Sequence, residues 1–268
     1  MNPSLEEPLI HPTAVVLPGS ELAGGVEVGP WCVVEPGVEL GEGVKLGPHV
    51  HLSGRTIIGA GTRIGTGSAL GGEPADKDYA GERSRVLIGE NCRIFEHCTV
   101  HRASGDESAT VLEDGVMMMA GSHVGHNSII RTGATLVNHS AVAGHAEVGE
   151  GAILVASSAV HQFGKVGRMT MVGGGSMVTK DAPPFSIVAG SYPIRWRTPN
   201  TIGLRRAGFS PEERDALRRA LHTLFTSGDS PTETANSCTE SEFPSVRELA
   251  NFVLTSKRGV CAGPERTS

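Results

Sequence analysis

The most unusual feature of this sequence is how few aromatic residues it contains. Phe, Trp and Tyr make up 4% of the 268 residues, whereas 36 residues are glycine. An ordinary globular core relies on aromatic and large aliphatic side chains. We therefore expect a narrow interior of small and branched side chains, as repeat proteins have.

The sequence also lacks a disulfide framework. Its five cysteines are an odd number, and no CxxC motif is present. This pattern argues against a zinc ribbon and favours a reducing compartment, so we expect a cytoplasmic protein. Residues 1–8 have neither the basic nor the apolar region of a signal peptide. No apolar run is long enough to predict a transmembrane segment.

The net charge of −6 gives no reason to expect a nucleic-acid partner. The charge is uneven, however, because residues 184–268 carry 11 Lys and Arg against 9 Asp and Glu. This part could meet an acidic partner through its arginines, which include Arg195, Arg197, Arg205, Arg206, Arg218 and Arg219.

An aliphatic residue or Met recurs at every sixth position from Ile10 to Val178. The period breaks at residues 71–87 and at 101–111 and resumes in the same phase after each break. The residue four places after each aliphatic position is small or β-branched; Cys32, Cys92 and Cys98 occupy such positions. An amphipathic α-helix cannot have this period, because 3.6 residues per turn does not divide into six.

Six residues suffice for one short strand and a corner. The small position and the next aliphatic position are two apart, so both side chains point inward. Three such units close a triangular coil of about 18 residues, and successive coils stack as parallel strands. We therefore predict a left-handed parallel β-helix over residues 1–183, with 71–87 and 101–111 as loops thrown out from it. The three cysteines are expected to be core thiols.

A small C-terminal α-helical domain is predicted over residues 184–268. Pro183 and Pro184 remove hydrogen-bond donors and end the strands. Ser210, Pro211 and Glu213 form a capping box that predicts a helix to about Phe225. A last helix is expected to be capped by Ser245. The fold class is thus mainly β, followed by helices.

Seven of the 11 histidines lie between residues 97 and 161, and none occupies an inward position. With a coil of about 18 residues, His126, Gly144 and Gln162 stack in one column. A patch of polar side chains is therefore predicted on three coils, formed by His123, His126, His145, His161 and Gln162. A histidine can act as general base near neutral pH, and a glycine N–H can stabilise an oxyanion. Because no GxSxG motif is present, direct attack by an acceptor hydroxyl is the simplest acyl-transfer mechanism.

A zinc site is the alternative interpretation of these histidines. Hexapeptide-repeat carbonic anhydrases bind zinc through three histidines at a subunit interface, but the spacing expected of that family is not matched here. We therefore expect neither a metal nor another cofactor.

Several segments resemble the family of acyl carrier protein–UDP-N-acetylglucosamine O-acyltransferases. They are MMAGSHVGHN at 118–127, LVNHSAVAGHAEVGEGAILVASSAVHQF at 136–163, VGGGSMVTKDAPPF at 172–185 and GLRRAGFS at 203–210. DYAGERSRVLIG and TVHRA match as well. The resemblance implies an enzyme that moves a 3-hydroxyacyl chain from acyl carrier protein to the 3-OH of UDP-N-acetylglucosamine, the first step of lipid A synthesis.

The resemblance also implies roles for individual residues. His126 would be the general base, Asn127 would orient it, and Gly144 would supply the oxyanion N–H. Gly174 matches the position that limits acyl length, and a glycine there predicts a long chain. The remaining substrate-binding residues would be Asp76, His123, His145, His161, Gln162, Asn200 and Arg206.

Two positions depart from the family pattern. Asn127 stands where the family usually has Asp, and Asp78 stands where it usually has Lys. An amide can orient an imidazole, but it cannot stabilise the imidazolium by charge. The alternatives are therefore a variant UDP-amino sugar as acceptor, or a catalytically weak paralogue that binds UDP-sugar or carrier.

The quaternary structure is expected to be a homotrimer. A β-helix with a histidine face open to solvent makes half of a cleft, and parallel copies would supply the other wall.

Overall fold

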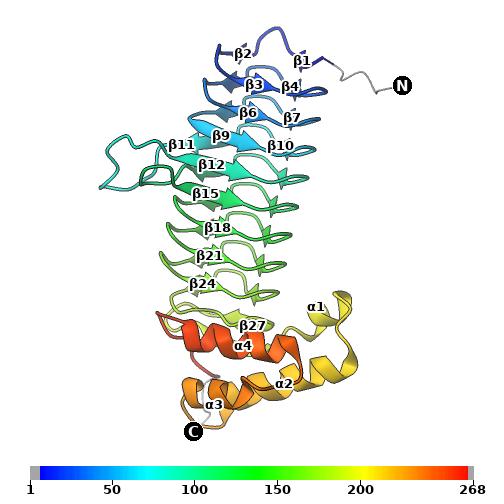
Figure 1. Ribbon diagram of the computed structural model, residues 1–268, viewed down its shortest axis with the longest axis vertical. Helices are drawn as coiled ribbons and strands as arrows, with labels where there is room; N and C mark the ends of the chain where they lie inside the picture. The colour runs from blue at the N-terminus through cyan, green and yellow to red at the C-terminus, as the bar shows by residue number, and fades with distance from the viewer. Residues whose placement is uncertain (1–6, 265–268) are drawn as a thin grey trace.

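The computed structural model describes residues 7–264, in which a long β-helix is followed by four α-helices (Figure 1). Residues 1–6 of the predicted β-helix and residues 265–268 of the predicted helical domain lie outside the described residues. The segment 1–8, in which no signal peptide is expected, is therefore mostly outside them as well. No helix of the described chain is long and apolar enough to cross a membrane.

Three sheets form the sides of the β-helix. The first contains β1 (Leu9–Ile10), β4 (Glu27–Val28), β7 (Lys45–Leu46), β10 (Arg63–Ile64), β13 (Arg93–Ile94), β16 (Met117–Met118), β19 (Thr135–Leu136), β22 (Ile153–Leu154), β25 (Met171–Val172), β27 (Ser186–Ala189) and β28 (Arg195–Pro199). The second contains β2 (Val15–Val16), β5 (Val33–Val34), β8 (His51–Leu52), β11 (Ala69–Gly72), β14 (Thr99–His101), β17 (His123–Val124), β20 (Ala141–Val142), β23 (Ala159–Val160) and β26 (Met177–Val178). The third contains β3 (Glu21–Leu22), β6 (Glu39–Leu40), β9 (Arg55–Ile58), β12 (Arg85–Ile88), β15 (Ala109–Leu112), β18 (Ile129–Ile130), β21 (Glu147–Val148) and β24 (Lys165–Val166).

The strands pair in parallel one coil apart, as the six-residue period requires. Leu9 lies opposite Glu27, and the same register continues along the stack. The second residue of nearly every two-residue strand is buried, and so is the small residue that precedes it by two positions. Cys32, Cys92 and Cys98 are among these buried small residues. The prediction of a left-handed parallel β-helix is confirmed.

Two excursions leave the β-helix where the period breaks. Because β11 runs to Gly72 and β12 begins at Arg85, the first loop is shorter than predicted; the second lies between His101 of β14 and Ala109 of β15. Figure 1 shows the first loop projecting from one side of the stack. Arg102, which follows β14, anchors this loop by donating to Gly71 O at 2.9 Å and to the Tyr79 hydroxyl at 2.8 Å. Both loops therefore leave from neighbouring strands, β11 and β14, in the middle of the second sheet.

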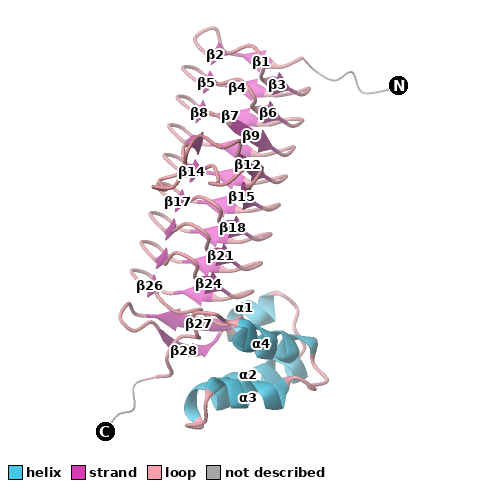
Figure 2. Ribbon diagram, turned by 60° about the vertical axis from the view of Figure 1, so that its left-hand side comes forward, coloured by secondary structure: helices cyan, strands magenta, loops and turns pink. Residues whose placement is uncertain are grey.

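The prediction that Pro183 and Pro184 end the strands is wrong, because these prolines lie at the turn before β27 and the first sheet continues beyond them. Strand β27 pairs in parallel with β25, and β28 pairs with β27 in antiparallel orientation. Four helices follow at this end of the stack (Figure 2). They are α1 (Thr201–Arg206), α2 (Pro211–Thr226), α3 (Pro231–Cys238) and α4 (Pro244–Thr255).

The predicted helix starts were right for α2 and wrong for α4. Ser210 caps α2 by accepting from Glu213 N. The last helix instead begins at Pro244 with Phe243 as N-cap, so Ser245 lies inside it. The Ser245 hydroxyl donates to the Glu213 carboxylate of α2 at 2.6 Å, which explains why it does not cap its own helix.

Candidate active site

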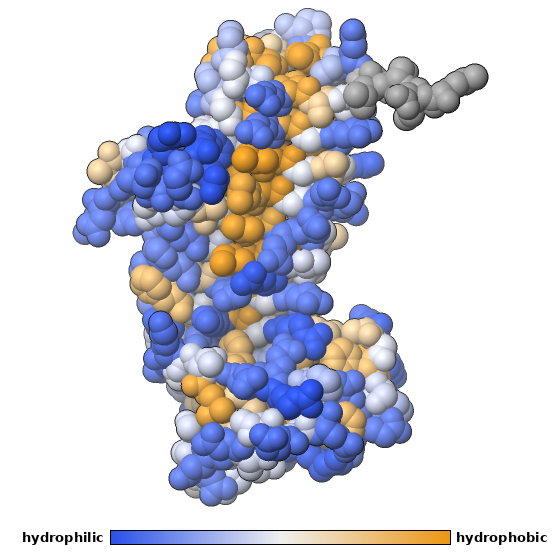
Figure 3. All heavy atoms as spheres, in the orientation of Figure 1, coloured by the Kyte–Doolittle hydropathy of each residue, from blue (hydrophilic) through white to orange (hydrophobic). Residues whose placement is uncertain are grey.

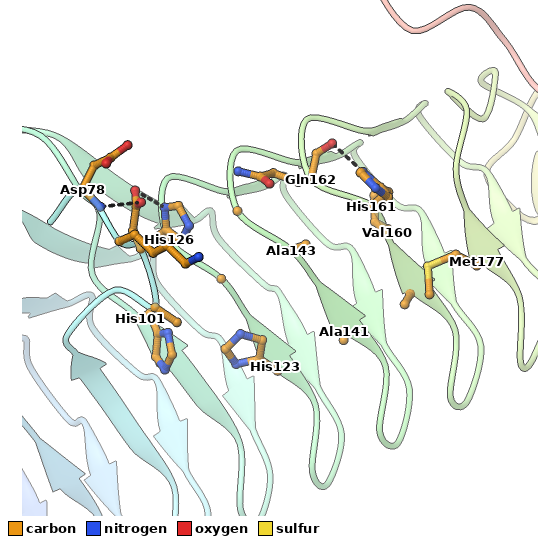
Figure 4. Close-up of a pocket in the computed structure, with 16 residues that line it drawn as sticks. Asp78, His101, His123, His126, Ala141, Ala143, Val160, His161, Gln162 and Met177 are labelled. Atoms are coloured by element: carbon orange, nitrogen blue, oxygen red, sulfur yellow. Dashed lines mark hydrogen bonds and ion pairs between the residues drawn. The ribbon is translucent and has the colours of Figure 1, made fainter.

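A cleft of about 750 Å³ lies along the outer face of the second sheet. Its residues come from successive coils and from the first loop, which contributes Asp76, Lys77 and Asp78 (Figure 4). The other lining residues include His101, His123, His126, Gly144, His161 and Gln162. The histidines predicted to share a patch therefore meet a loop that the repeat pattern did not place.

His126 is held in one orientation at the floor of this cleft. Its side chain is nearly buried, and Nδ1 lies 2.9 Å from Oδ1 of Asn127. Because this oxygen only accepts, Nδ1 carries the ring proton and the neutral imidazole keeps a lone pair on Nε2. A Cβ on Gly144 would contact Nε2 directly, so this ring edge faces Gly144.

The amide of Asn127 is itself fixed by the backbone of Ser104. Ser104 N–H donates to Asn127 Oδ1 at 3.0 Å, and Asn127 Nδ2 donates to Ser104 O at 2.9 Å. A backbone N–H can only donate and a carbonyl can only accept, so the reverse amide orientation is excluded. Asn127 N–H also donates to the buried Thr110 hydroxyl at 2.8 Å. Asn127 has φ of 58°, a left-handed conformation that Asn tolerates well.

Asp76 brings a carboxylate to the same place. Its Oδ2 lies 3.8 Å from His126 Nδ1 and accepts from the Ser104 hydroxyl at 2.7 Å. The Ser104 hydroxyl, followed by Asp78 N–H, lowers the pKa of Asp76, and the nearby His126 and His145 act in the same direction. Asp76 is therefore ionised at neutral pH.

A column of rings continues from His126 along the corner of the β-helix. The His145 ring stands edge-on to His126 with centroids 5.1 Å apart, and Phe163 stacks on His145 at 4.8 Å. Desolvation, followed by the neighbouring His126, lowers the pKa of His145. His145 and Phe163 occupy the turn position of Asn127 one and two coils later, again with positive φ.

His101 and His123 form a second pair on the wall of the cleft. Their rings are edge-on with centroids 4.9 Å apart, and the Thr99 hydroxyl lies 2.8 Å from His123 Nδ1. Burial lowers the pKa of His123 to about 4, with His101 and His126 contributing, so His123 is neutral at neutral pH. Nδ1 of His101 is buried without a hydrogen-bond partner in the described chain.

Beyond His123 the wall of the cleft becomes apolar. The strand register places Ala141, Ala159 and Met177 in line with His123, one coil further each time. All three line the cleft and are half-buried (Figure 4). Two of these side chains are small and the third is flexible, and together they form an apolar track that leads away from His101 and His123.

The predicted site residues divide into three groups. Asp76, His123, His126, Gly144, His161 and Gln162 line the cleft. Asn127 and His145 do not line it, but both contact His126. Gly174, Asn200 and Arg206 lie outside the cleft within a single chain.

The side chain of Asn200 has a structural role that was not predicted from the sequence. It is the N-cap of α1, where Oδ1 accepts from Gly203 N at 3.1 Å and Nδ2 donates to Met169 O at 2.8 Å. Arg206 is exposed at the other end of the same helix. The roles predicted for these two residues, and for Gly174, stay predictions.

Three further residues of the site were not predicted from the sequence: Ser104, His101 and Met177. Ser104 carries no repeat signal, because it lies in the second loop. His101 was counted among the clustered histidines, but nothing in its position distinguished it from the others. Met177 could have been found from the register, since it falls one coil after Ala159 on the outward face.

One group of side chains has the geometry to hold a metal ion. A carboxylate oxygen of Asp76 and ring nitrogens of His126 and His145 lie within 4.8 Å of one another. Carboxylate and imidazole ligands suit zinc and similar divalent cations. The same His126 cannot be both a ligand through Nε2 and a base through that atom.

Two family models and several solved structures are similar to this chain. Residues 37–72 match a model described as bacterial transferase hexapeptide (six repeats), and residues 181–261 match the second domain of Udp N-acetylglucosamine O-acyltransferase. The structure resembles a solved UDP-N-acetylglucosamine acyltransferase from Francisella novicida, with a TM-score of 0.92 at 30% identity. That match covers 96% of this chain and 95% of the other.

Curated relatives agree over almost the full length. The acyl-[acyl-carrier-protein]–UDP-N-acetylglucosamine O-acyltransferase of Azotobacter vinelandii is 48% identical, and its namesake in Pseudomonas fluorescens is 40% identical. Each alignment spans 94% of this chain and 98% of the relative. The chain therefore belongs to the acyl-[acyl-carrier-protein]–UDP-N-acetylglucosamine O-acyltransferase family.

Proposed function

We propose that this chain transfers a 3-hydroxyacyl group from acyl carrier protein to the 3-OH of UDP-N-acetylglucosamine, the first step of lipid A synthesis. The observation that supports this best is the state of His126. Its Nδ1 is bonded to Asn127, and its Nε2 edge faces Gly144 in a cleft that continues into an apolar track. This is the arrangement that a general base needs when it activates a hydroxyl beside a long acyl chain.

In the proposed mechanism His126 Nε2 accepts the proton of the sugar hydroxyl. The oxygen attacks the thioester carbonyl, and the carbonyl oxygen becomes an oxyanion. The Gly144 N–H makes no hydrogen bond within the described part of the chain, so it is available to stabilise that oxyanion. The intermediate collapses, the carbon–sulfur bond breaks, and the proton passes from His126 to the thiolate that leaves. The scheme needs neither a metal nor another cofactor.

The acyl chain would lie along the apolar track of Ala141, Ala159 and Met177. These side chains are small or flexible, and their apolar surface is half-buried before any ligand binds. Gly174 lies in the turn that precedes β26 and is exposed. A glycine there leaves room for a long chain.

The polar side chains of the cleft would hold the nucleotide sugar and the carrier's phosphopantetheine. Asp76 would contact the sugar at the His126 end of the cleft, together with His123 and His145. His161 and Gln162 are exposed two coils further along, beside Val160 (Figure 4), where they would contact the phosphopantetheine. Arg206 would reach the nucleotide phosphates, and Asn200 would assist from the start of the same helix. The exposed arginines of the C-terminal domain would face the acidic carrier, although Arg218 and Arg219 already pair with Asp215.

The working form would be a homotrimer. Ile57, Leu87, Val111 and Ile129 are in register on the outer face of the third sheet, and all are half-buried. Figure 3 shows an apolar band over this face. Packing of this band against other copies would remove it from water and complete the walls of the cleft. A monomeric mass in solution would contradict the proposal.

We also propose that the protein acts in the cytoplasm. All five of its cysteines are free, and four of them are buried. Free thiols are typical of a reducing compartment.

A UDP-sugar bearing a 3-amino group is a second candidate acceptor. Asp78 lines the cleft beside Asp76. A second carboxylate there would suit a cationic amino group better than a neutral hydroxyl. A paralogue that binds without catalysis is less favoured, because the contacts of Asn127 leave His126 in a state that can accept a proton.

The test is turnover with 3-hydroxyacyl carrier protein and a set of UDP-sugars, followed by mass spectrometry of the products. His126→Gln should lower kcat by a factor of roughly a hundred to ten thousand. His51→Gln, on an exposed histidine paired with Glu35 far along the second sheet, is the matched control and should leave turnover unchanged. No product with any UDP-amino sugar would overturn the proposed function, and an unchanged rate in His126→Gln would overturn the base assignment.

A further inference from the structure

The Nδ1 side of His126 faces an amide, although a carboxylate lies nearby. When His126 accepts a proton, the imidazolium needs a negative charge close to it. Asn127 contributes a neutral oxygen at 2.9 Å. Within the described chain the only ion pair of His126 is with Asp76, whose Oδ2 lies 3.8 Å from the same Nδ1.

Ser104 is bonded to both of these groups. Its backbone N–H and C=O hold the two ends of the Asn127 amide, and its hydroxyl donates to Asp76 Oδ2 at 2.7 Å. The hydroxyl also lies 3.1 Å from Asn127 Oδ1, but its single proton favours the shorter bond to the charged acceptor. One residue of the second loop thus ties the amide, the carboxylate and the first loop together.

We propose that two residues share the task of stabilising His126 in its two protonation states. Asn127 fixes the tautomer of the neutral ring, and Asp76 supplies the negative charge that stabilises the imidazolium. Ser104 is the positioning residue that holds both. The inference rests on the proposed function. It explains how His126 can act as a base although an amide, and not a carboxylate, stands at position 127. The lowered pKa of Asp76, for which the Ser104 hydroxyl is the largest cause, agrees with a permanent charge there.

The geometry predicts that a carboxylate at position 127 would be unfavourable. The atom now occupied by Nδ2 would become an oxygen facing Ser104 O at 2.9 Å, where two acceptors repel each other. It would also add a second negative charge beside ionised Asp76. Lys77 and Asp78 also line the cleft, but both are exposed and their charges are opposite in sign. The rings around His126 are those of His145, His101 and His123, and burial lowers the pKa of each. These neutral rings would offset none of the added charge at pH 8.

Asn127→Asp is the sharpest test, because it changes no heavy-atom shape. Only the protonated carboxyl reproduces the amide, since only then can it donate to Ser104 O. We expect kcat at pH 8 to be roughly tenfold below that of the unaltered protein, with a deficit that shrinks as the pH is lowered. A kcat at pH 8 equal to or above that of the unaltered protein would overturn the inference.

Ser104→Ala tests the link to Asp76 separately. It removes the hydroxyl but leaves both backbone bonds to Asn127, so kcat should fall by roughly three- to tenfold, more than KM for the UDP-sugar rises. Ser104→Thr keeps a hydroxyl and should restore most of the loss. Ser108→Ala is the matched control, because the Ser108 hydroxyl bonds only within the same loop, to Ser104 O and Gly105 O.

The outcomes separate this inference from the function on which it rests. Equal losses in Ser104→Ala and Ser108→Ala would indicate general loosening of the loop and would overturn the positioning role. If the unaltered protein acylates a UDP-sugar while Asn127→Asp is as active at pH 8, only the division of roles is wrong. An unaltered protein that acylates no UDP-sugar would overturn both.

Discussion

Gly144 lies so close to the His126 imidazole that position 144 has no room for a side chain. A Cβ there would come within 2.7 Å of His126 Cε1 and closer still to Nε2. The backbone of Gly144 is not in the left-handed region, so the ring and not the chain conformation imposes glycine. The residue that would donate to the oxyanion therefore also determines where the base can lie.

Gly144→Ala should lower kcat by roughly a hundredfold or more, because the methyl group displaces the imidazole from the acceptor hydroxyl. The thermal midpoint should change little, since the ring can move toward the cleft. Steady-state kinetics and a thermal melt of the same preparation provide the two measurements. The double variant with His126→Ala should be no less active than His126→Ala alone, as expected for groups that act as a unit. Full activity of Gly144→Ala would contradict the proposed position of the base.

Gly174→Met should shift the preference toward shorter acyl donors. A side chain there would begin 3.3 Å from Ala156 O and 3.5 Å from Val155 Cγ1, on the exposed turn that leads into β26. Turnover of long-chain donors should fall by roughly tenfold or more, because a clashing chain must shift or leave its track. Competition between donors of different length in one reaction gives the comparison, with short donors as the internal control. An unchanged length preference would mean that Gly174 does not border the acyl chain.

Folding stability should decline as the pH falls from about 6.5 toward 4. Burial lowers the pKa of His123 to about 4, whereas in the unfolded chain the ring takes up a proton near 6.5. Between these values the unfolded state binds more protons, so the free energy of unfolding decreases on acidification, by at most about 3 kcal/mol from this residue. Urea unfolding at pH 7.5 and pH 5, at one protein concentration, measures it. His123→Gln should lose part of this pH dependence; the same slope in the variant would count against the assignment.

Zinc should inhibit the enzyme, and chelation should not. Asp76, His126 and His145 can converge on a divalent cation. An ion on Nε2 of His126 would occupy the lone pair of the base, and an ion on Nδ1 would leave the ring proton on Nε2, so His126 could not accept a proton in either case. We expect protein dialysed against EDTA to be fully active and His145→Gln to need roughly tenfold more Zn²⁺ for half-inhibition. Loss of activity on EDTA treatment that Zn²⁺ restores would place a metal in the reaction and contradict the expectation that none is required.

The six-residue period determined the β-helix and much of the site. Because side chains alternate across a strand, the period assigns every position to the core or to the outside. Because three units close one coil, it also stacks His126, Gly144 and Gln162 in one column. The three of them line the cleft together with His123 and His161. Local rules of this kind need no knowledge of distant contacts, which is why they could be applied to the sequence alone.

The tertiary structure decided what the loops and chain ends contact. Asp76 and Ser104 lie in loops without a period, and their meeting at Asn127 depends on how the two loops pack. Ser245 looked like a helix cap and instead bonds to Glu213, a residue 32 positions away. Asn200, for which the family resemblance predicts contact with the nucleotide, caps α1 and bonds to Met169. In each case a polar side chain found a partner far away in the sequence, and the energy of such a contact depends on geometry that only the folded chain creates. The six-residue period by itself thus predicted most of the β-helix residues that face the cleft, and the packing of the loops decided how the base among them is held.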